Sequence, residues 1–215
     1  MINDLICGAC SGVAQSLIGH PLDTYKVLIQ SNTKNMYINP WRGIQYPMMT
    51  SIINCALTFS IHEELKNHNV PEYIRGFISG ACISPIVYVS DNYKLNEQIG
   101  KKQNINFTSI MSNKGKITVL MRESIAFSVY FYTYEKTKKY TNNSLLSGGI
   151  AGLGNWTITY PIDVIRNRQI SNRINITQAI KMGSLWNGYL FCAFRAIKVN
   201  ALGFYVFEMC KSLVV

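Results

Sequence analysis

Acidic and basic side chains recur at one fixed spacing in this sequence, an acid followed three residues later by a base. The first charge set comprises Asp23 with Lys26, Asp91 with Lys94, and Asp163 with Arg166. The second charge set comprises Glu63 with Lys66, Glu135 with Lys138, and Glu208 with Lys211. Such groups suit electrostatic pairing and the binding of charged molecules. No Ser-His-Asp set, metal-ligand cluster or phosphate-binding glycine loop accompanies them, so we expect neither an enzyme nor a bound cofactor or metal.

Glycines and prolines repeat in register with the first charge set. Each acid–base pair follows a glycine pair, and a proline stands two residues before the acid in two of the three copies, with Val89 in the other. The glycine pairs are Gly8 with Gly12, Gly76 with Gly80, and Gly148 with Gly152. A further glycine precedes each member of the second set, at Gly43, Gly115 and Gly188. The register predicts three repeats of one helical hairpin, over residues 1–68, 69–140 and 141–215.

Uncharged stretches of membrane-spanning length lie between these charges. Residues 5–22, 43–61 and 140–162 contain no Asp, Glu, Lys or Arg, and each is close to the length that crosses a hydrocarbon core. The other helix of each hairpin is expected over residues 76–90, 124–134 and 182–207. These stretches are shorter or contain charged residues, so their assignment as membrane spans depends on the repeat. Basic residues crowd the connections after the odd-numbered helices, which indicates two distinct faces. We therefore expect an all-α membrane protein with six transmembrane helices in a threefold pseudosymmetric bundle.

Composition narrows the possible partners. Hydrophobic residues make up 48% of the chain and charged residues 15%, which excludes a disordered protein. The formal charge of +10 is not gathered into one run or one nucleic-acid-binding motif, so we expect no nucleic acid partner. The six cysteines are dispersed in apolar stretches, which argues against a disulfide framework.

At this point the residues resemble the mitochondrial carrier family over essentially the whole chain. The family signature is proline, any residue, acid, two residues and base on odd helices, with an aromatic–acid–two–base motif on even ones. The segments 19–27, 120–124 and 148–156 look most like carriers of carnitine, acylcarnitine and ornithine-like amino acids. His62 replaces the usual aromatic before Glu63, and the segment between Gln30 and Trp41 is shorter than is usual in the family.

The resemblance implies two interhelix ion-pair networks, one at each end of the bundle. On the matrix side it pairs Asp23 with Lys94, Asp91 with Arg166, and Asp163 with Lys26, braced by Gln30 and Gln98. On the cytoplasmic side it pairs Lys66 with Glu135, Lys138 with Glu208, and Lys211 with Glu63. If neither network is too stable, the two can open alternately around a central cavity.

The second helices of the three hairpins can be aligned by Gly43, Gly115 and Gly188. This alignment predicts a substrate site at mid-membrane depth. Charges at that depth are costly and mark a substrate path by default. The residues at this level are Thr50, Arg122, Glu123 and Arg195, with Lys198 one turn beyond. By resemblance, arginine and glutamate together suit an amino-acid-like or carnitine-like zwitterion, arginine for the carboxylate and glutamate for the amino group. A purely structural Arg122–Glu123 pair is the alternative.

Other functions stay open at this stage. Surplus positive charge from Lys198 would suit a nucleotide or deoxynucleotide, and the missing proline and short loops would suit a membrane scaffold that transports nothing. The resemblance implies a multi-pass protein of the mitochondrial inner membrane, functional as a monomer, with a small-molecule substrate and with cardiolipin as a candidate lipid partner. Abundant Asn, Ile, Lys and Tyr suggest an AT-rich genome, such as that of a parasite or a giant virus, and for a virus the membrane would be the host's.

Overall fold

The computed structural model describes residues 2–30, 39–99 and 107–190, and beyond these 192–194, 196, 199, 206, 209–210 and 212. This part of the chain is helical and contains no strand. Its helices are α1 (Ile2–Gln30), α2 (Gln45–Asn67), α3 (Glu72–Ile99), α4 (Phe107–Ser112), α5 (Lys116–Thr141), α6 (Ser144–Asn172) and α7 (Ile176–Lys181). The sixth long helix, expected over residues 182–207, falls mostly outside the described residues, although 189–190 and 192–194 are helical.

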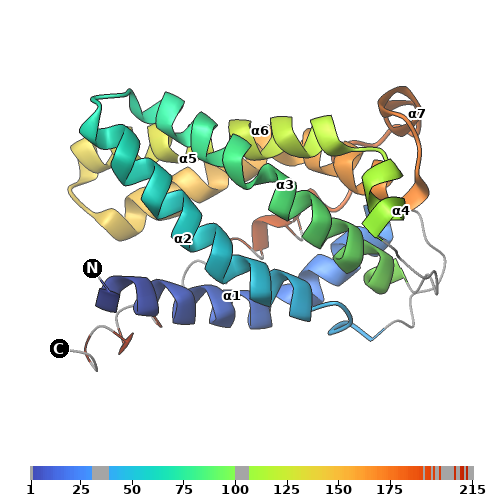
Figure 1. Ribbon diagram of the computed structural model, residues 1–215, viewed down its shortest axis with the longest axis horizontal. Helices are drawn as coiled ribbons and strands as arrows, with labels where there is room; N and C mark the ends of the chain where they lie inside the picture. Colours follow the sequence, from blue (N-terminus) through green and yellow to red (C-terminus); the bar gives the residue numbers. More distant parts are fainter. Residues whose placement is uncertain are drawn as a thin grey trace.

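Five long helices run alternately up and down an elongated bundle (Figure 1). The connections between α2 and α3 and between α5 and α6 lie at the same end as the start of α1, and the short helices α4 and α7 lie at the opposite end. Both tight connections contain an asparagine in the left-handed region, Asn69 at φ 53° and Asn142 at φ 50°, a conformation that Asn tolerates better than most residues. The arrangement is that of successive helical hairpins.

Many polar side chains are buried in the interior of the bundle, beside apolar clusters that include Val27, Leu95 and Ile170, and many large apolar side chains are exposed. Asp163, Gln98 and Thr159 are fully buried, whereas Met49 is 70% and Leu190 is 70% exposed. A water-soluble bundle would place these two classes the other way round. Lipid as the surrounding solvent explains the pattern, because apolar side chains can then face outward at no cost.

Glycines set how closely α3 and α5 approach. A Cβ atom placed on Gly76 would lie 2.5 Å from the carbonyl oxygen of Phe127, and one on Gly80 would lie 2.4 Å from that of Glu123. Neither separation is sterically possible, so only glycine permits this backbone contact. The crossing fixes the depth at which Glu123 stands relative to α3.

Three glycines with positive φ stand before the second helix of each predicted hairpin: Gly43 at 81°, Gly115 at 107° and Gly188 at 83°. A Cβ on Gly43 would lie 3.2 Å from the carbonyl oxygen of Lys94, and one on Gly115 would lie 3.3 Å from Cγ1 of Ile170. One on Gly188 would lie 3.9 Å from Cγ of Lys26. Each turn therefore contacts the first helix of the next hairpin, and the third contacts that of the first.

One buried arginine fastens α7 to the rest of the bundle. The Arg168 guanidinium donates to four backbone carbonyls: Gln30 at 3.3 Å, Ala179 at 3.0 Å, Gly183 at 2.6 Å and Ser184 at 3.4 Å. These carbonyls lie at the end of α1, in α7 and in the turn after it, so a single side chain joins three segments.

The helix ends and the apolar spans differ from the sequence expectations. Tyr140 belongs to α5, which ends at Thr141, so the stretch predicted over 140–162 combines the end of one helix with most of another. Among the described helices, only α3 is both long enough and apolar enough to qualify as a membrane span by length and composition. The other long helices contribute polar faces to the interior, which lowers their average hydropathy.

Candidate functional site

Three interhelix ion pairs form a network toward the end of the bundle where α4 and α7 lie. Lys94 Nζ lies 3.2 Å from Asp23 Oδ2, and Arg166 Nη1 lies 3.0 Å from Asp91 Oδ2. Lys26 pairs with Asp163. These are the three pairings that the family resemblance implies for the first charge set. Each joins the acid of one hairpin to the base of the next, so the network closes on itself.

The three pairs differ in burial and in the number of partners. The side chains of Asp163 and Lys26 are 1% and 6% exposed, against 16% for both Asp23 and Lys94. Asp163 also lies 2.9 Å from Arg166 Nη2 and 3.8 Å from Arg122 Nε. Asp163 is therefore the centre of the network, with three cations around one carboxylate.

Trp156 packs beside this centre. Lys26 Nζ lies 4.7 Å from the centre of its ring system and Arg122 Cζ lies 5.1 Å from it. Both distances are within cation–π range. The indole therefore contacts one cation of the network and one cation of the predicted substrate site.

The glutamines do not contact the ion pairs as braces would. Gln30 donates to the Tyr160 hydroxyl at 3.1 Å and accepts from Asn167 at 2.5 Å, and Gln98 donates to Thr24 at 2.9 Å. These hydrogen bonds join neighbouring helices, since Tyr160 and Asn167 lie in α6 and Thr24 in α1.

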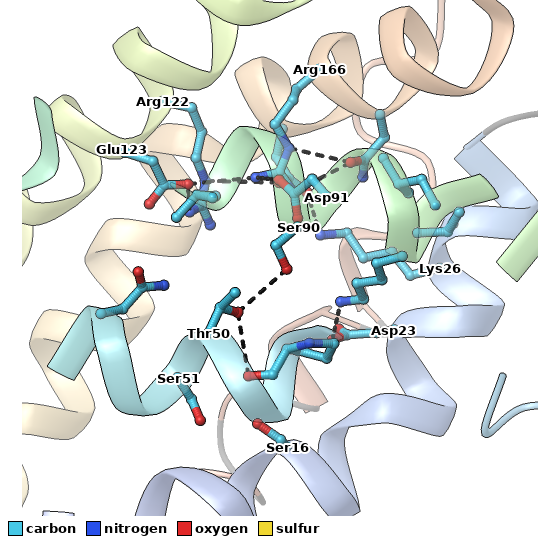
Figure 2. A pocket seen from close by; sticks show the side chains of 18 of the residues that line it. Ser16, Asp23, Lys26, Thr50, Ser51, Ser90, Asp91, Arg122, Glu123 and Arg166 are labelled. Atoms are coloured by element: carbon cyan, nitrogen blue, oxygen red, sulfur yellow. Dashed lines mark hydrogen bonds and ion pairs between the residues drawn. The ribbon is translucent and has the colours of Figure 1, made fainter. Parts of the chain in front are cut away.

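A cavity of about 310 Å³ lies next to the network. The predicted substrate residues Thr50, Arg122 and Glu123 all line it, together with the six residues of the first charge set. Figure 2 shows Arg122, Glu123 and Arg166 on one side of the cavity and the hydroxyls of Ser16, Thr50 and Ser51 on the other. Arg195 and Lys198 lie outside the described residues.

The cavity and the network share side chains. Glu123 Oε1 accepts from Arg122 Nη1 at 2.6 Å and lies 3.5 Å from Arg166 Nη1. Because Arg166 also binds Asp91 and Asp163, an unbroken chain of charges leads from the predicted substrate pair to the network. A ligand that binds Arg122 or Glu123 therefore competes with groups that hold the network together.

The second charge set is described only in part. Lys66, Glu135 and Lys138 are described, whereas Glu208 and Lys211 lie outside the described residues and only the backbone of Glu63 is placed, in α2. Between described residues, Lys66 and Glu135 do not form the ion pair that the resemblance implies. Lys138, whose implied partner Glu208 lies outside the described residues, has its Nζ 5.5 Å from the centre of the Tyr134 ring.

Several cavity residues were missed in the sequence. Trp156 stands seven residues before Asp163, two helical turns away on the same face, and Asn54 stands one turn after Thr50. Helical periodicity could have found both. The contact between Glu123 and Arg166 had no such signal, because it depends on how far two side chains reach between helices.

Comparison with known proteins agrees with this geometry. The sequence matches the family Mitochondrial carrier protein over residues 1–40 and 140–215. It is 26% identical to the mitochondrial basic amino acids transporter of Bos taurus, over 78% of this chain and 72% of that protein. It is 23% identical to the mitochondrial ornithine transporter 1 of Saccharomyces cerevisiae, over 99% and 96%.

A third relative is the human mitochondrial carnitine/acylcarnitine carrier protein, which is 24% identical over 98% of this chain and 94% of that protein. The family match, the charge pairs and the lipid-type distribution of side chains point the same way. The chain therefore belongs to the mitochondrial carrier family, a family of membrane transporters and not of enzymes.

Proposed function

We propose that this carrier exchanges a small amino-acid-like zwitterion across the mitochondrial inner membrane by alternating access. The observation that carries the proposal is the cavity that holds the Arg122–Glu123 pair in direct contact with the ion-pair network. A zwitterion can replace both members of that pair at once, its carboxylate on Arg122 and its ammonium on Glu123. Replacement of only one member would leave the other as an unpaired buried charge.

The charge balance of the cavity favours a ligand without large net charge. The described lining contains four acids and four bases, which are Asp23, Asp91, Glu123 and Asp163 with Lys26, Lys94, Arg122 and Arg166. A volume of about 310 Å³ is at the small end of ligand pockets, which span roughly 300–1,000 Å³. Both features suit an amino acid better than a nucleotide.

Transport follows from the shared side chains. Substrate that binds Glu123 weakens its hold on Arg166, and substrate that binds Arg122 withdraws a cation from Asp163. A partly exposed ion pair such as Asp23–Lys94 contributes roughly 0–1 kcal/mol, and in the buried Asp163–Lys26 pair the cost of desolvation offsets much of the attraction. Opening of the ring is therefore within reach of the differential binding energy of a substrate. Without substrate the network stays closed, and exchange becomes the favoured mode.

The second charge set forms the opposing gate in this proposal. No ion pair joins the described side chains of Lys66 and Glu135 while the first network is closed, which is consistent with alternating access. The three turns with positive φ and the cyclic contacts between hairpins support a six-helix bundle of three repeats, over residues 1–68, 69–140 and 141–215. Two of the relatives are named for basic amino acids and for ornithine, which supports the substrate class.

Exchange in liposomes tests the proposal. Purified protein is reconstituted with an internal amino acid, and uptake of labelled zwitterionic or basic amino acids, carnitine and nucleotides is measured. We expect amino acid uptake that is abolished in Arg122→Ala and retained in Arg173→Ala. Arg173 serves as the control because it is an exposed arginine that contacts Ser109 and does not line the cavity. Uptake of nucleotides alone would contradict the zwitterion proposal, and no uptake of any compound would favour a scaffold.

A further inference from the structure

A largely buried cluster of charged side chains lies between α2, α3 and α5, at the end of the bundle that holds the second charge set. Glu72 pairs with Arg75 one turn later in α3, and Glu72 Oε2 lies 3.5 Å from His62 Nε2 of α2. The His62 ring packs on that of Phe131 in α5, with 4.3 Å between the ring centres. The cluster is separate from the central cavity, because none of its four residues belongs to the described lining.

The Arg75 guanidinium has hydrogen-bonding capacity that the cluster does not use. Its side chain is 9% exposed, and its Nε and Nη1 atoms are buried without a hydrogen-bond partner among the described residues. A buried donor without a partner is costly, above all in a charged group. Arg75 is therefore stabilised by any acceptor that a change of conformation brings within its reach.

The packing of α3 on α5 shows which acids lie near these donors. The two helices are antiparallel (Figure 1), and Gly76 contacts the backbone of Phe127. Four residues toward the start of α3 correspond to four residues toward the end of α5, which places Glu72 level with Phe131. The contacts of both residues with His62 agree with this register.

Glu135 is the acid of α5 that this register brings closest to the cluster. It stands one turn beyond Phe131 on the same face of α5, about 5.4 Å along the helix axis. Helical side chains tilt toward the N-terminus of their own helix, so Arg75 and Glu135 lean toward each other. Lys66, the implied partner of Glu135, stands one turn beyond His62 in α2. The cluster thus lies directly inside the implied Lys66–Glu135 pair.

We propose that Arg75 is a positioning residue of the second gate, which binds the Glu135 carboxylate when that gate closes and shares it with Lys66. The inference rests on the proposed alternating access, and it adds a cation from α3 to those that the second charge set supplies. A buried arginine can bind two acids at once, because its guanidinium has five N–H donors. The first network has the same property, since Arg122 approaches Asp163 from outside the first charge set.

A double-mutant cycle separates this role from a purely structural one. Arg75→Gln, Glu135→Gln and the double variant are compared by their rate of amino acid exchange in liposomes and by their melting temperature in detergent. A matched cycle uses Glu72→Gln in place of Glu135→Gln, because Glu72 is the acid that Arg75 pairs with in the described conformation. Arg75→Lys retains the charge with fewer donors.

We expect Arg75→Gln to slow exchange by about tenfold, as for the loss of one charge-assisted hydrogen bond, and to cause little further slowing when Glu135→Gln is already present. The melting temperature should show the coupling with Glu72 instead, since that pair exists while the second gate is open. Arg75→Lys should restore part of the exchange rate. If Arg75→Gln alone fails to fold, the cycle is measured in the Glu72→Gln background, where the acid left unpaired is neutral.

Two kinds of result overturn the inference. An exchange rate that Arg75→Gln leaves unchanged, or equal slowing with and without Glu135→Gln, refutes the role of Arg75 in the second gate while exchange itself stands. Failure of wild type to exchange any amino acid refutes the proposed function, and the inference with it.

Discussion

Neutralisation of Asp163 should destabilise the protein far more than neutralisation of Asp23, although both are acids of the first charge set. Asp163 is 1% exposed and has Lys26, Arg166 and Arg122 around it, so Asp163→Asn leaves three buried cations without their shared carboxylate. Removal of one partner from a buried ion pair costs about 3–5 kcal/mol. Asp23 is 16% exposed, and its described ionic partner is Lys94, so Asp23→Asn should cost about 1 kcal/mol.

These energies predict different melting temperatures. For a chain of this size, 1 kcal/mol corresponds to a shift of about 2–4 °C. We expect Asp163→Asn to lower the melting temperature in detergent by about 6–20 °C and Asp23→Asn by about 2–4 °C. Lys26→Met should fall between them, because Asp163 then keeps Arg166 at 2.9 Å.

Intrinsic tryptophan fluorescence during heating measures these transitions, since Trp156 lies against Lys26 and Arg122. The double variant Lys26→Met with Asp163→Asn should be more stable than the sum of the two single losses predicts, because each single change removes the same contact. Equal shifts for Asp163→Asn and Asp23→Asn would refute the reasoning, since burial and partner number would then have no effect on stability.

The remaining predictions concern helix packing and the second charge set. Gly80→Ala should destabilise the protein by about 1–3 kcal/mol in thermal unfolding, because its methyl group would lie 2.4 Å from the Glu123 carbonyl oxygen. Gly149→Ala, where a Cβ meets no atom within 4 Å, is the control and should be tolerated. Glu135→Gln should change the free energy of unfolding by no more than about 0.5 kcal/mol, because no described cation pairs with Glu135. It should nevertheless slow exchange in liposomes, and a melting temperature as low as that of Asp163→Asn would contradict the assignment of Glu135 to an open gate.

The pairing of the first charge set could be predicted from the family resemblance, and one repeated offset agrees with it. Acid and base stand three residues apart on each odd helix, so the three helices present the same two charges at the same depth. The positive φ of Gly43, Gly115 and Gly188 follows the same register. The repeats thus indicate which residues lie at equivalent positions in different helices, which a single sequence without repeats does not show.

Contacts that break the threefold pattern could not be predicted. Only the second hairpin carries an arginine and a glutamate at mid-depth, and the approach of Glu123 to Arg166 depends on how closely Gly80 lets α5 approach α3. Hydropathy was also a poor guide to the spans. Polar residues such as Thr159 and Asp163 are buried within α6, where they reduce the apolar average of the helix while facing the interior of the bundle.

Arg168 has a consequence for how far the connecting segments of this carrier can be shortened or altered. Its four acceptors are backbone carbonyls, and every amino acid supplies one. The sequence of the segment around α7 can therefore drift without loss of its anchor, provided that the path of the backbone is kept. Arg168 itself, by contrast, cannot be replaced freely, because its planar guanidinium has five N–H donors and reaches all four acceptors at once. Lysine has three donors, so Arg168→Lys would lose at least one of these hydrogen bonds.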